Sequence, residues 1–382
     1  MNLKQFFRRF FADKNNGHEP DKVLMITVAI IVVFGIIMLS SATSAYAYAT
    51  KAQDSYYFFK HQLFGLTLGI IAFLILSRID YHFWRKYALG FLFFSIVLLL
   101  LVFIPGLSAH YGKARSWINV LGFSLQPSEF VKISFLLYLS AWLESRRERL
   151  HDLKEGIGPF LVVLGLIAFL MLLQPDLGTL LIISMTSLIV YFVGGGKKRH
   201  ILAIILVGLL ALMILVKIKP YQADRFKCFM DPNYSSSDVC YQVNQSLIAV
   251  GSGGFWGRGL GASRQKFMYL PEVGGDSVFP IIGEEVGFLF SGGLIALYLL
   301  LFYRGYKIAK HSADHFGRNL AIGIVSWLVV QAIINIGGMV NFMPMTGVPL
   351  PFVSYCGSAM LAALAAVGVL ANISKHTKDY VQ

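Results

Sequence analysis

The chain has 382 residues, of which 56% are hydrophobic and 14% are charged, and its formal net charge is +13. A soluble domain carries about 25% charged residues, so most of the surface of this protein cannot face water. The composition therefore excludes an ordinary soluble domain.

Long apolar runs follow one another along nearly the whole chain. A helix that spans the hydrocarbon needs about 20 residues, so the shorter runs must include flanking residues. Backbone amides in lipid need internal partners, which makes such runs helices, whereas a β-barrel would show short alternating segments. The sequence therefore predicts an all-α integral membrane protein with about ten transmembrane helices, built on the runs Val23–Leu39, Gln62–Leu76, Tyr87–Ile104, Ser128–Leu143, Ile157–Gln174, Leu177–Val193, Ile201–Val216, Val286–Tyr303, Leu320–Met339 and Phe352–Ile373.

An even number of spans places both termini on one side of the membrane. The segments on that side hold 21 of the 33 Lys and Arg residues, so the positive-inside rule makes this side cytoplasmic. The positive charge thus reflects membrane orientation, and we expect no nucleic-acid partner. Ala45–Ala47 resembles a signal-peptidase site, but the long polar leader and apolar run favour an uncleaved first helix. We divide the chain into a cytoplasmic tail at 1–22, one membrane domain at 23–373 and a cytoplasmic tail at 374–382.

The longest connection, at about 217–280, lies on the predicted outer side between the seventh and eighth helices. A loop of more than about 15 residues is usually functional or disordered, and this one is rich in glycine and aromatic residues. We expect a short interfacial helix at Gln245–Val250. Cys228 and Cys240 share the loop and could form a disulfide or remain two free thiols. Any chemistry is expected on this outer face.

Charged residues beside or inside the predicted helices are the first functional candidates. Glu129 and Lys132 lie three residues apart, on one face of a predicted helix. Charges at membrane depth are costly and usually pair or serve function. These two form either a structural ion pair or a site in which Lys132 helps to hold an anionic substrate. Asp176 directly precedes a predicted helix, where an N-cap is the favoured interpretation.

Asp276 is an acidic residue of the outer loop that lacks a simple structural explanation. Glu284 and Glu285 fall in the first turns of a helix predicted to begin near Ile281, where the helix dipole favours negative side chains. Asp276 lies outside that helix and follows two glycines. A carboxylate at this position could serve as a general base or as a cation ligand.

Two further outer segments could contribute to a site. The glycines at 257, 259 and 261 could let backbone amides and Arg258 approach a pyrophosphate, although close packing of the loop is the more ordinary explanation. The segment 341–352 contains three prolines, which forbid a regular helix. An irregular segment at membrane depth must be buried in protein or line a wet cavity, so it points to a site between helices.

Together these motifs resemble the shape, elongation, division and sporulation (SEDS) family, the family of FtsW, RodA and SpoVE. Each motif alone is weak, but they follow the family order across nearly the whole chain and are together specific. Gly259–Ser263 with Gln265-Lys266 is more similar to the division branch, that of FtsW, than to the elongation branch. The matching stretches are Ala114–Ile118, Gln126–Glu129 with Lys132, Gln174–Thr179, Tyr241–Ser246, Ser252–Gly261, Tyr269–Glu272, Gly283–Glu285 and Asn341–Ser358.

The resemblance implies an inverting peptidoglycan glycosyltransferase that polymerises lipid II at the outer face of the bacterial cytoplasmic membrane. It also implies a class B penicillin-binding protein and other membrane proteins of the divisome as partners, with a location at the division septum. No tightly bound cofactor is expected. A divalent cation, Mg²⁺ or Mn²⁺, is the one candidate.

The resemblance also assigns roles to residues. The essential loop aspartate of the family falls on Asp276, which would deprotonate the 4-hydroxyl of the acceptor sugar or help to position a cation. The departing undecaprenyl pyrophosphate needs cationic stabilisation, and the candidates in order are Lys132, Arg258, Arg115 and Lys266. The expected substrate-binding set is completed by Glu129, Asp176 and Ser354.

The sequence departs from the family pattern in three places. Asp276 follows Gly-Gly and precedes Ser-Val-Phe, where the family usually has His-Thr and Phe-Ile-Phe. Cys356 stands where a glycine is usual, and the pair Cys228 and Cys240 is not a general family feature. The Pro-Glu-x-x-x-Asp register is kept, so the role of Asp276 survives while its flanking contacts differ.

Two other classes of protein fit an outward-facing bundle. A flippase that moves lipid II across the membrane should show paired repeats and broken helices near mid-membrane, and no convincing repeat is visible. A non-catalytic scaffold that recruits the penicillin-binding protein would not need Asp276. The unusual residues cluster at the outer face, which favours the enzyme.

Overall fold

The computed structural model describes residues 18–51, 53–104, 108–111, 114–120, 123–150, 152–231, 234 and 238–378. Most of the predicted N-terminal tail and the last four residues of the predicted C-terminal tail lie outside this part of the chain. The division into two tails and one membrane domain therefore stays a prediction.

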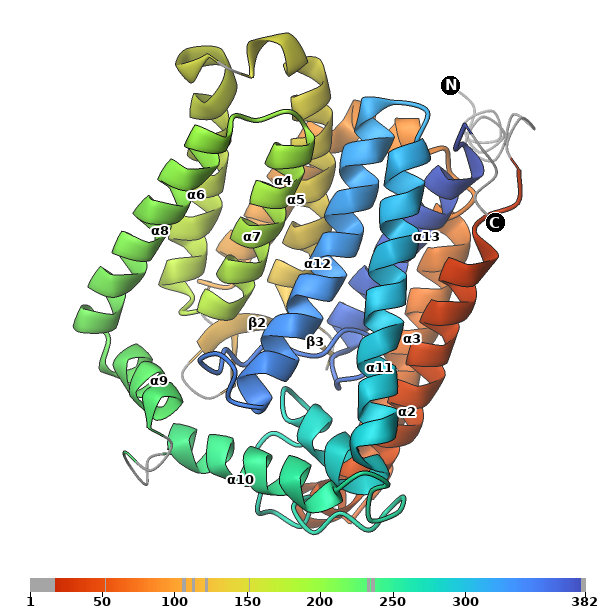
Figure 1. Ribbon diagram of the computed structural model, residues 1–382, viewed down its shortest axis with the longest axis vertical. Coiled ribbons are helices and arrows are strands. Elements are labelled where there is room, and N and C mark those ends of the chain that lie inside the picture. Colours follow the sequence, from red (N-terminus) through yellow and green to blue (C-terminus); the bar gives the residue numbers. More distant parts are fainter. Residues whose placement is uncertain are drawn as a thin grey trace.

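In the described part of the chain, ten helices correspond to the ten predicted apolar runs. Figure 1 shows how they pack into a bundle. Among the described residues, eight helices are long and apolar enough to cross a membrane. The other two are α7, with 17 residues, and α5, which carries three charged residues. The prediction of a helical membrane protein with about ten spans is confirmed. The ten helices are α2 (Lys22–Thr50), α3 (Tyr57–Leu76), α4 (Tyr81–Leu101), α5 (Pro127–Ser145), α6 (Gly158–Leu173), α7 (Leu177–Val193), α8 (Lys198–Ile218), α11 (Val278–His311), α12 (His315–Met339) and α13 (Gly357–Lys375).

Helix α12 lies at the centre of the bundle and is almost entirely buried. It contacts α5, α7, α11 and α13, and its Trp327 is among the largest fully buried side chains. Helix α8, at the edge of Figure 1, has no buried residue, as expected for a helix that faces lipid on nearly all sides. Polar side chains on α12 are therefore held inside protein, where each needs a hydrogen-bond partner.

The two ends of the described chain meet at one end of the bundle. The His18 backbone N–H donates to the Lys375 carbonyl at 3.1 Å, and the Asp21 N–H donates to the Ser374 hydroxyl at 3.0 Å. Asp21 also pairs with Arg304 of α11, and both side chains are buried. Both ends thus lie on one side, as an even number of spans requires. The long 217–280 connection occupies the opposite end, called the loop end below (Figure 1).

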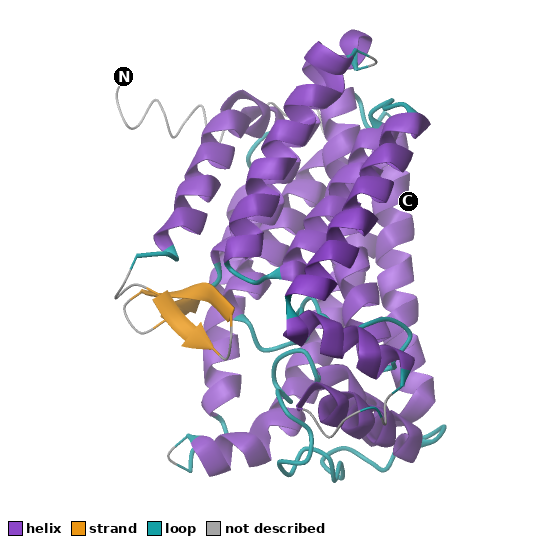
Figure 2. Ribbon diagram, turned by 90° about the vertical axis from the view of Figure 1, so that its left-hand side faces the viewer, coloured by secondary structure: helices purple, strands orange, loops and turns teal. Residues whose placement is uncertain are grey.

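A small antiparallel sheet between α4 and α5 was not predicted. Its strands are β1 (Ser108–Tyr111), β2 (Ala114–Val120) and β3 (Phe123–Leu125), in the order β1-β2-β3. Figure 2 shows the sheet at one side of the bundle. Ser116 and Ile118 are buried while Asn119 is exposed, which is the alternation of a half-buried strand. These strands are too short to stand out beside long apolar runs.

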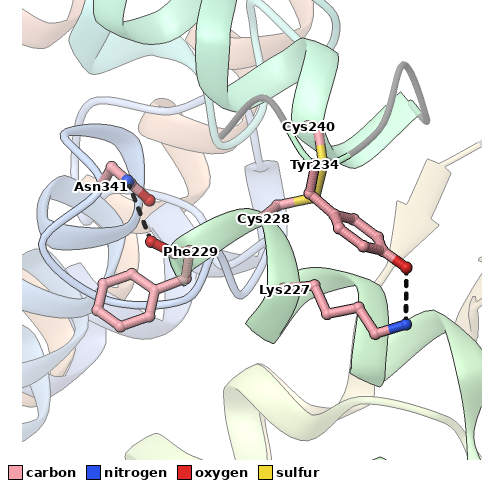
Figure 3. The surroundings of a disulfide bond; sticks show 6 residues. All are labelled: Lys227, Cys228, Phe229, Tyr234, Cys240 and Asn341. Atoms are coloured by element: carbon pink, nitrogen blue, oxygen red, sulfur yellow. Dashed lines mark hydrogen bonds between the residues drawn. A yellow bond between two sulfur atoms is a disulfide. The ribbon is translucent and has the colours of Figure 1, made fainter. Parts of the chain in front are cut away.

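Two helices begin the long connection, α9 (Pro220–Met230) and α10 (Asp238–Gly253). The short helix predicted at Gln245–Val250 lies inside α10, which is longer than expected. A disulfide between Cys228 and Cys240 joins the two helices (Figure 3), so the question left open by the sequence is answered for the pair.

The segment 341–356 is irregular, as its prolines predicted, and half of its residues are buried in protein. The apolar run predicted from Phe352 is helical only from Gly357, because residues 350–354 form a turn. In this turn the Leu350 N–H donates to the Ser354 hydroxyl at 2.8 Å. A Cβ added at Gly35 of α2 would lie 2.7 Å from the Phe352 carbonyl oxygen, so α2 approaches this segment closely.

Helix α11 is broken at Gly287, whose φ of 72° and ψ of −174° are not helical. The loop segment 254–259 fills the break. The Arg258 and Gly259 N–H groups donate to the carbonyls of Glu284 and Glu285 at 3.0 and 2.9 Å. On the other side of the break, the Phe288 N–H donates to the Gly254 carbonyl at 2.9 Å. The freed backbone groups are therefore satisfied by protein, as a break at membrane depth requires.

The acidic pair in α11 has a different role from the one predicted. Because α11 begins at Val278, Glu284 and Glu285 lie beyond its first turn, and both side chains are almost fully buried. Glu284 accepts from the Ser263 hydroxyl at 2.6 Å and from two loop N–H groups. Glu285 pairs with Lys266 at 2.9 Å. The two carboxylates thus anchor the outer loop, and the helix-dipole explanation is wrong.

Gly287→Ala should destabilise the protein by more than about 1 kcal/mol, because a residue with a Cβ is strained at this φ. The added Cβ would also overlap the Gly257 nitrogen and lie 2.6 Å from the Phe255 carbonyl oxygen. Thermal unfolding in detergent measures the effect.

Gly293→Ala is the matched control on the same helix. Gly293 is exposed, has helical geometry, and nothing lies within 4 Å of an added Cβ. Alanine is favoured over glycine in a helix by about 1 kcal/mol, so this variant should be neutral or more stable. Equal unfolding temperatures for the two variants would contradict the role of the break.

Candidate functional site

Asp276 lies on a tight turn at the loop end, two residues before α11 begins. The N–H groups of Gly275 and Ser277 both donate to the Glu272 carbonyl, at 2.9 and 3.3 Å. The Tyr355 N–H donates to the Gly274 carbonyl at 2.7 Å, which ties the turn to the irregular segment 341–356. The Asp276 side chain is only 7% exposed. The sequence therefore folds this carboxylate into the protein rather than out into water.

Two side chains donate to the Asp276 carboxylate. Gln242 of α10 donates from Nε2 to Oδ1 at 3.2 Å, and the Ser277 hydroxyl donates to the same oxygen at 3.2 Å. Gln242 also donates to the Ser277 hydroxyl at 2.8 Å, so the three groups form one small network. Oδ2, the second carboxylate oxygen, faces away from this network toward Gly347.

A cation faces that second oxygen. A Cβ added at Gly347 would lie 3.7 Å from both Asp276 Oδ2 and Arg225 Nη2, so Gly347 separates the two charged groups. Arg225, on α9, donates from Nη1 to the Thr346 carbonyl at 3.1 Å and from Nη2 to the Tyr221 hydroxyl at 2.7 Å. The two groups form no direct salt bridge, because none of their oxygen and nitrogen atoms lie within 4.0 Å of each other.

The amide of Asn335 fixes the backbone around Asp276. Its Nδ2 donates to the Asp276 carbonyl at 2.8 Å and to the Val348 carbonyl at 2.8 Å. One turn earlier on α12, Gln331 donates to the Pro349 carbonyl at 2.8 Å. The central helix thus holds the Asp276 turn and the irregular segment side by side.

The environment makes Asp276 a much weaker acid than an ordinary aspartate. Burial and, after it, the nearby Glu272 carboxylate raise the pKa of its carboxyl from 3.8 to about 6. The Ser277 hydroxyl and the Arg225 guanidinium lower the pKa in part. A carboxylate with a pKa near the working pH is suited to accept and release a proton during catalysis.

Several buried polar atoms beside Asp276 have no hydrogen-bond partner within the described part of the chain. They are Nε of Arg225, Oγ1 of Thr346 and Oδ1 of Asn335. Buried polar atoms are normally paired, so unpaired atoms call for a missing partner such as water or ligand. Their side chains bond the Asp276 backbone, or bond or belong to the segment beside it, so this region can still bind a polar ligand.

Lys132 and Glu129 form the buried ion pair that the sequence allowed. Their side chains are 2% and 1% exposed, and Lys132 Nζ lies 2.8 Å from Glu129 Oε1. Lys132 also donates to Gln331 Oε1 at 2.7 Å and lies 5.0 Å from the centre of the Trp327 ring. Gln331 therefore connects Lys132 on one side with the irregular segment on the other.

Other predicted site residues have structural partners. Asp176 caps α7 by accepting from the Thr179 N–H at 3.0 Å, so the N-cap interpretation is confirmed. The Ser354 hydroxyl accepts from Leu350 within its own turn. Their roles in substrate binding stay predictions.

The remaining predicted cations lie in the outer loop or in the sheet. Arg258 donates from Nε to the Ser252 carbonyl at 3.1 Å and lies 3.8 Å from Glu284. Lys266 is buried and bonded to Glu285 and to the Gly261 carbonyl. It lines a cavity of about 620 Å³ with Ser41 and Phe267. Arg115 belongs to β2, and its side chain lies outside the described residues.

The residues around Asp276 were given no role by the sequence interpretation. Arg225, Gln242 and Asn335 come from three different helices, and of the three only Gln242 lies in a stretch that matches the family, Tyr241–Ser246. Arg225 did lie in the long basic loop that was predicted to carry function. A search for polar residues in buried helices could have marked Gln331 and Asn335, since such residues are costly in a membrane protein unless paired.

The fold and the site define a polytopic membrane enzyme whose candidate acid–base residue is buried at one end of the bundle. Comparison with known proteins identifies the class more closely. Residues 21–379 match the model of the family of cell cycle proteins that groups FtsW, RodA and SpoVE. The chain belongs to this family.

Relatives and solved structures of this family cover nearly the whole chain. The chain is 39% identical over 360 residues to the probable peptidoglycan glycosyltransferase FtsW of Trichlorobacter lovleyi. The matched residues cover 94% of this chain and 94% of the relative. It is 37% identical to the stage V sporulation protein E of Bacillus subtilis, over 94% of this chain and 98% of the relative.

Two solved structures resemble the fold closely. One is a chain of a peptidoglycan synthase complex that coordinates polymerization and crosslinking, with a TM-score of 0.76 and 28% identity over 94% of this chain and 99% of that one. The other is the rod shape determining protein RodA of Thermus thermophilus, with a TM-score of 0.70 and 28% identity. This match covers 94% of this chain and 98% of that one.

Lys132→Met should lower stability strongly, because it leaves Glu129 as an unpaired charge in the bundle. Removing one partner of a buried pair costs about 3–5 kcal/mol. The double variant Glu129→Gln/Lys132→Met removes both charges and should regain most of this loss. Thermal unfolding and glycan polymerisation are measured on both proteins.

The double variant separates structural from substrate-binding roles. If Lys132 holds an anionic substrate, the double variant is stable but does not polymerise. A double variant that recovers both stability and polymerisation would leave the ion pair with a structural role alone.

Proposed function

We propose that this protein polymerises lipid II into glycan strands at the loop end of its bundle, which is the outer face of the membrane, and that Asp276 is the catalytic base. The activity is that of a peptidoglycan glycosyltransferase, the name that relatives at 36–39% identity carry. The single observation that supports the site is a buried carboxylate whose pKa is raised to about 6, surrounded by unpaired polar atoms.

The chemistry requires a base at the acceptor sugar. Asp276 in its ionised form would accept the proton of the acceptor 4-hydroxyl as that oxygen attacks the anomeric carbon of the donor. The bond from that carbon to undecaprenyl pyrophosphate breaks, and the anomeric centre is inverted. Oδ2 is the oxygen suited to this step, because Oδ1 already accepts hydrogen bonds from Gln242 and Ser277.

The departing pyrophosphate needs positive charge close to it. Arg225 is the cation nearest to Asp276 in the described structure, and its unpaired Nε is available to a phosphate oxygen. We therefore place Arg225 ahead of Arg258 and Lys266, which are bonded within the outer loop. Lys132 stays a candidate, since Gln331 links it to the segment beside the site. Fixed charges of this kind stabilise the transition state without reorganisation.

A divalent cation would be held by the carboxylates of Asp276 and Glu272. Glu272 lies close enough to raise the pKa of Asp276, so the two form an acidic pair on one turn. Mg²⁺ is usually bound by one or two carboxylates together with substrate phosphates, and this donor set suits it. Such a cation would neutralise developing charge on the leaving group. Among the described residues, no cluster of three or more metal-binding side chains occurs.

The partners follow from the same proposal. Lipid II is the substrate, a class B penicillin-binding protein is the cross-linking partner, and other divisome membrane proteins recruit the complex. The similarity to a chain of a peptidoglycan synthase complex supports a partner of this kind. Multiple apolar helices embed the protein in the membrane. We further propose that it acts at the division septum, as its FtsW relatives suggest.

The flippase and scaffold interpretations have less support. Within the described residues, the one helix with non-helical geometry inside it is α11, and its break at Gly287 is filled by loop backbone. A flippase should instead place paired breaks around a central binding site. A scaffold gives no reason to bury a carboxylate with a raised pKa beside an arginine.

Asp276→Asn should abolish polymerisation, because an amide cannot accept the proton at this position. General-base catalysis contributes about 10²- to 10⁴-fold, so the loss should be at least hundredfold. Product is measured by gel from purified lipid II, with the cognate class B penicillin-binding protein present.

Asp54→Asn is the control on the same face. Asp54 pairs with Lys60 at the exposed end of α3, away from the candidate site, so this variant should polymerise normally. Wild-type polymerisation by a folded Asp276→Asn protein would remove Asp276 from catalysis.

Polymerisation should fall as the pH is lowered through about 6, because protonated Asp276 cannot act as a base. With a pKa of about 6, the rate at pH 5 should be about tenfold below the rate at pH 7. Glu272 raises this pKa, so Glu272→Gln should move the midpoint to lower pH. A profile that stays flat between pH 5 and 7 would contradict the assignment.

A further inference from the structure

The disulfide between Cys228 and Cys240 joins the two helices that each bring one side chain to Asp276. On α9, Arg225 lies three residues before Cys228, so both lie on one face of the helix. On α10, Gln242 lies two residues after Cys240, within the same turn. The disulfide therefore lies within one helical turn of Arg225, the cation that faces Asp276 across Gly347, and within one turn of Gln242, which donates to Asp276.

Both sulfur atoms are buried against the end of the central helix. Cys228 and Cys240 are fully buried and pack with Val243, Met339 and Met345. Met339 is the last residue of α12 and lies one turn after Asn335, which fixes the Asp276 backbone. The disulfide thus occupies the junction where α9 and α10 meet the helix that holds the site.

Helix α9 depends on this junction for its position. It follows α8, which has no buried residue and cannot hold α9 against the bundle. Two hydrogen bonds join α9 to the irregular segment. Arg225 donates to the Thr346 carbonyl at 3.1 Å, and Asn341 donates to the Phe229 carbonyl at 3.4 Å (Figure 3). A covalent bond to α10 is the strongest restraint available at this end of α9.

We propose that the Cys228–Cys240 disulfide is a positioning element of the catalytic site, which holds Arg225 and Gln242 against Asp276. This proposal rests on the proposed function of Asp276. Without the bond, α9 separates from α10 and Arg225 moves away from Gly347, while the fold of the ten-helix bundle is retained. The bond makes the activity of this chain depend on oxidation of one cysteine pair in the outer loop.

The positioning role predicts a loss of rate that depends on Arg225. Arg225 is the cation on the far side of Gly347 from Asp276 Oδ2. Its departure removes positive charge from the leaving-group side of the site, so the loss falls on kcat more than on KM. Loss of folded protein alone lowers the rate equally with and without Arg225.

The test is a double-mutant cycle on the full-length protein with its cognate partner. The four proteins are wild type, Cys228→Ser/Cys240→Ser, Arg225→Ala, and the variant with all three changes. Residues that act together give non-additive effects. Opening the disulfide should lower polymerisation by about threefold to tenfold in the wild type, and by less than about twofold once Arg225 is absent. The loss should fall on kcat more than on KM, because Arg225 is proposed to stabilise charge that develops in the transition state.

Controls keep the test decisive. Lys227→Ala removes a bond between Lys227 and Tyr234 on the surface of the same loop and should leave the rate unchanged. If the serine variant folds poorly, Cys228→Ala/Cys240→Val keeps the buried junction apolar and should show the same loss of rate. Amide exchange of α9 should rise in either variant.

The outcomes distinguish the two proposals. Equal losses with and without Arg225, or a wild-type rate in both disulfide variants, would overturn the positioning role while Asp276→Asn stays inactive. Polymerisation by Asp276→Asn would instead overturn the proposed function itself.

Discussion

The amide of Asn335 joins the two segments on which the candidate site depends. Its two hydrogens bond the Asp276 carbonyl and the Val348 carbonyl, each at 2.8 Å. One segment is the turn that precedes α11, and the other is the irregular stretch before α13, so neither has a regular partner of its own. An unmade hydrogen bond in a buried site costs about 1–3 kcal/mol. The burial of α12 therefore determines where the Asp276 carboxylate lies.

The same helix couples this turn to the charged pair of α5. Gln331 accepts from Lys132 and from Trp327 through its oxygen and donates to the Pro349 carbonyl through its nitrogen. The oxygen and the nitrogen of this amide therefore both form hydrogen bonds. The single side chain of Gln331 links Lys132 to the irregular segment. Low dielectric strengthens such a network and makes each missing partner costly. Asp276, Arg225 and the Lys132 pair thus belong to one connected region of an otherwise apolar bundle.

The sequence predicts the bundle well because each span needs only local composition. The ten runs, the irregular Pro-rich segment and the Asp176 cap all follow from residues that are close together in the chain. The surroundings of Asp276 do not follow in this way, since Arg225, Gln242 and Asn335 meet only through tertiary packing. The interpretation of Glu284 and Glu285 failed because α11 begins earlier and is broken at Gly287. The small sheet was missed because its strands span only three to seven residues.

A structure of the protein bound to unreactive donor and acceptor analogues of lipid II would test the central claim most directly. Our account predicts the acceptor 4-hydroxyl within about 2.6–3.2 Å of an Asp276 carboxylate oxygen. It also predicts the donor pyrophosphate on the Arg225 side of Gly347. An acceptor hydroxyl bound at another carboxylate, with Asp276 still bonded only to Gln242 and Ser277, would contradict the assignment of Asp276 as the catalytic base.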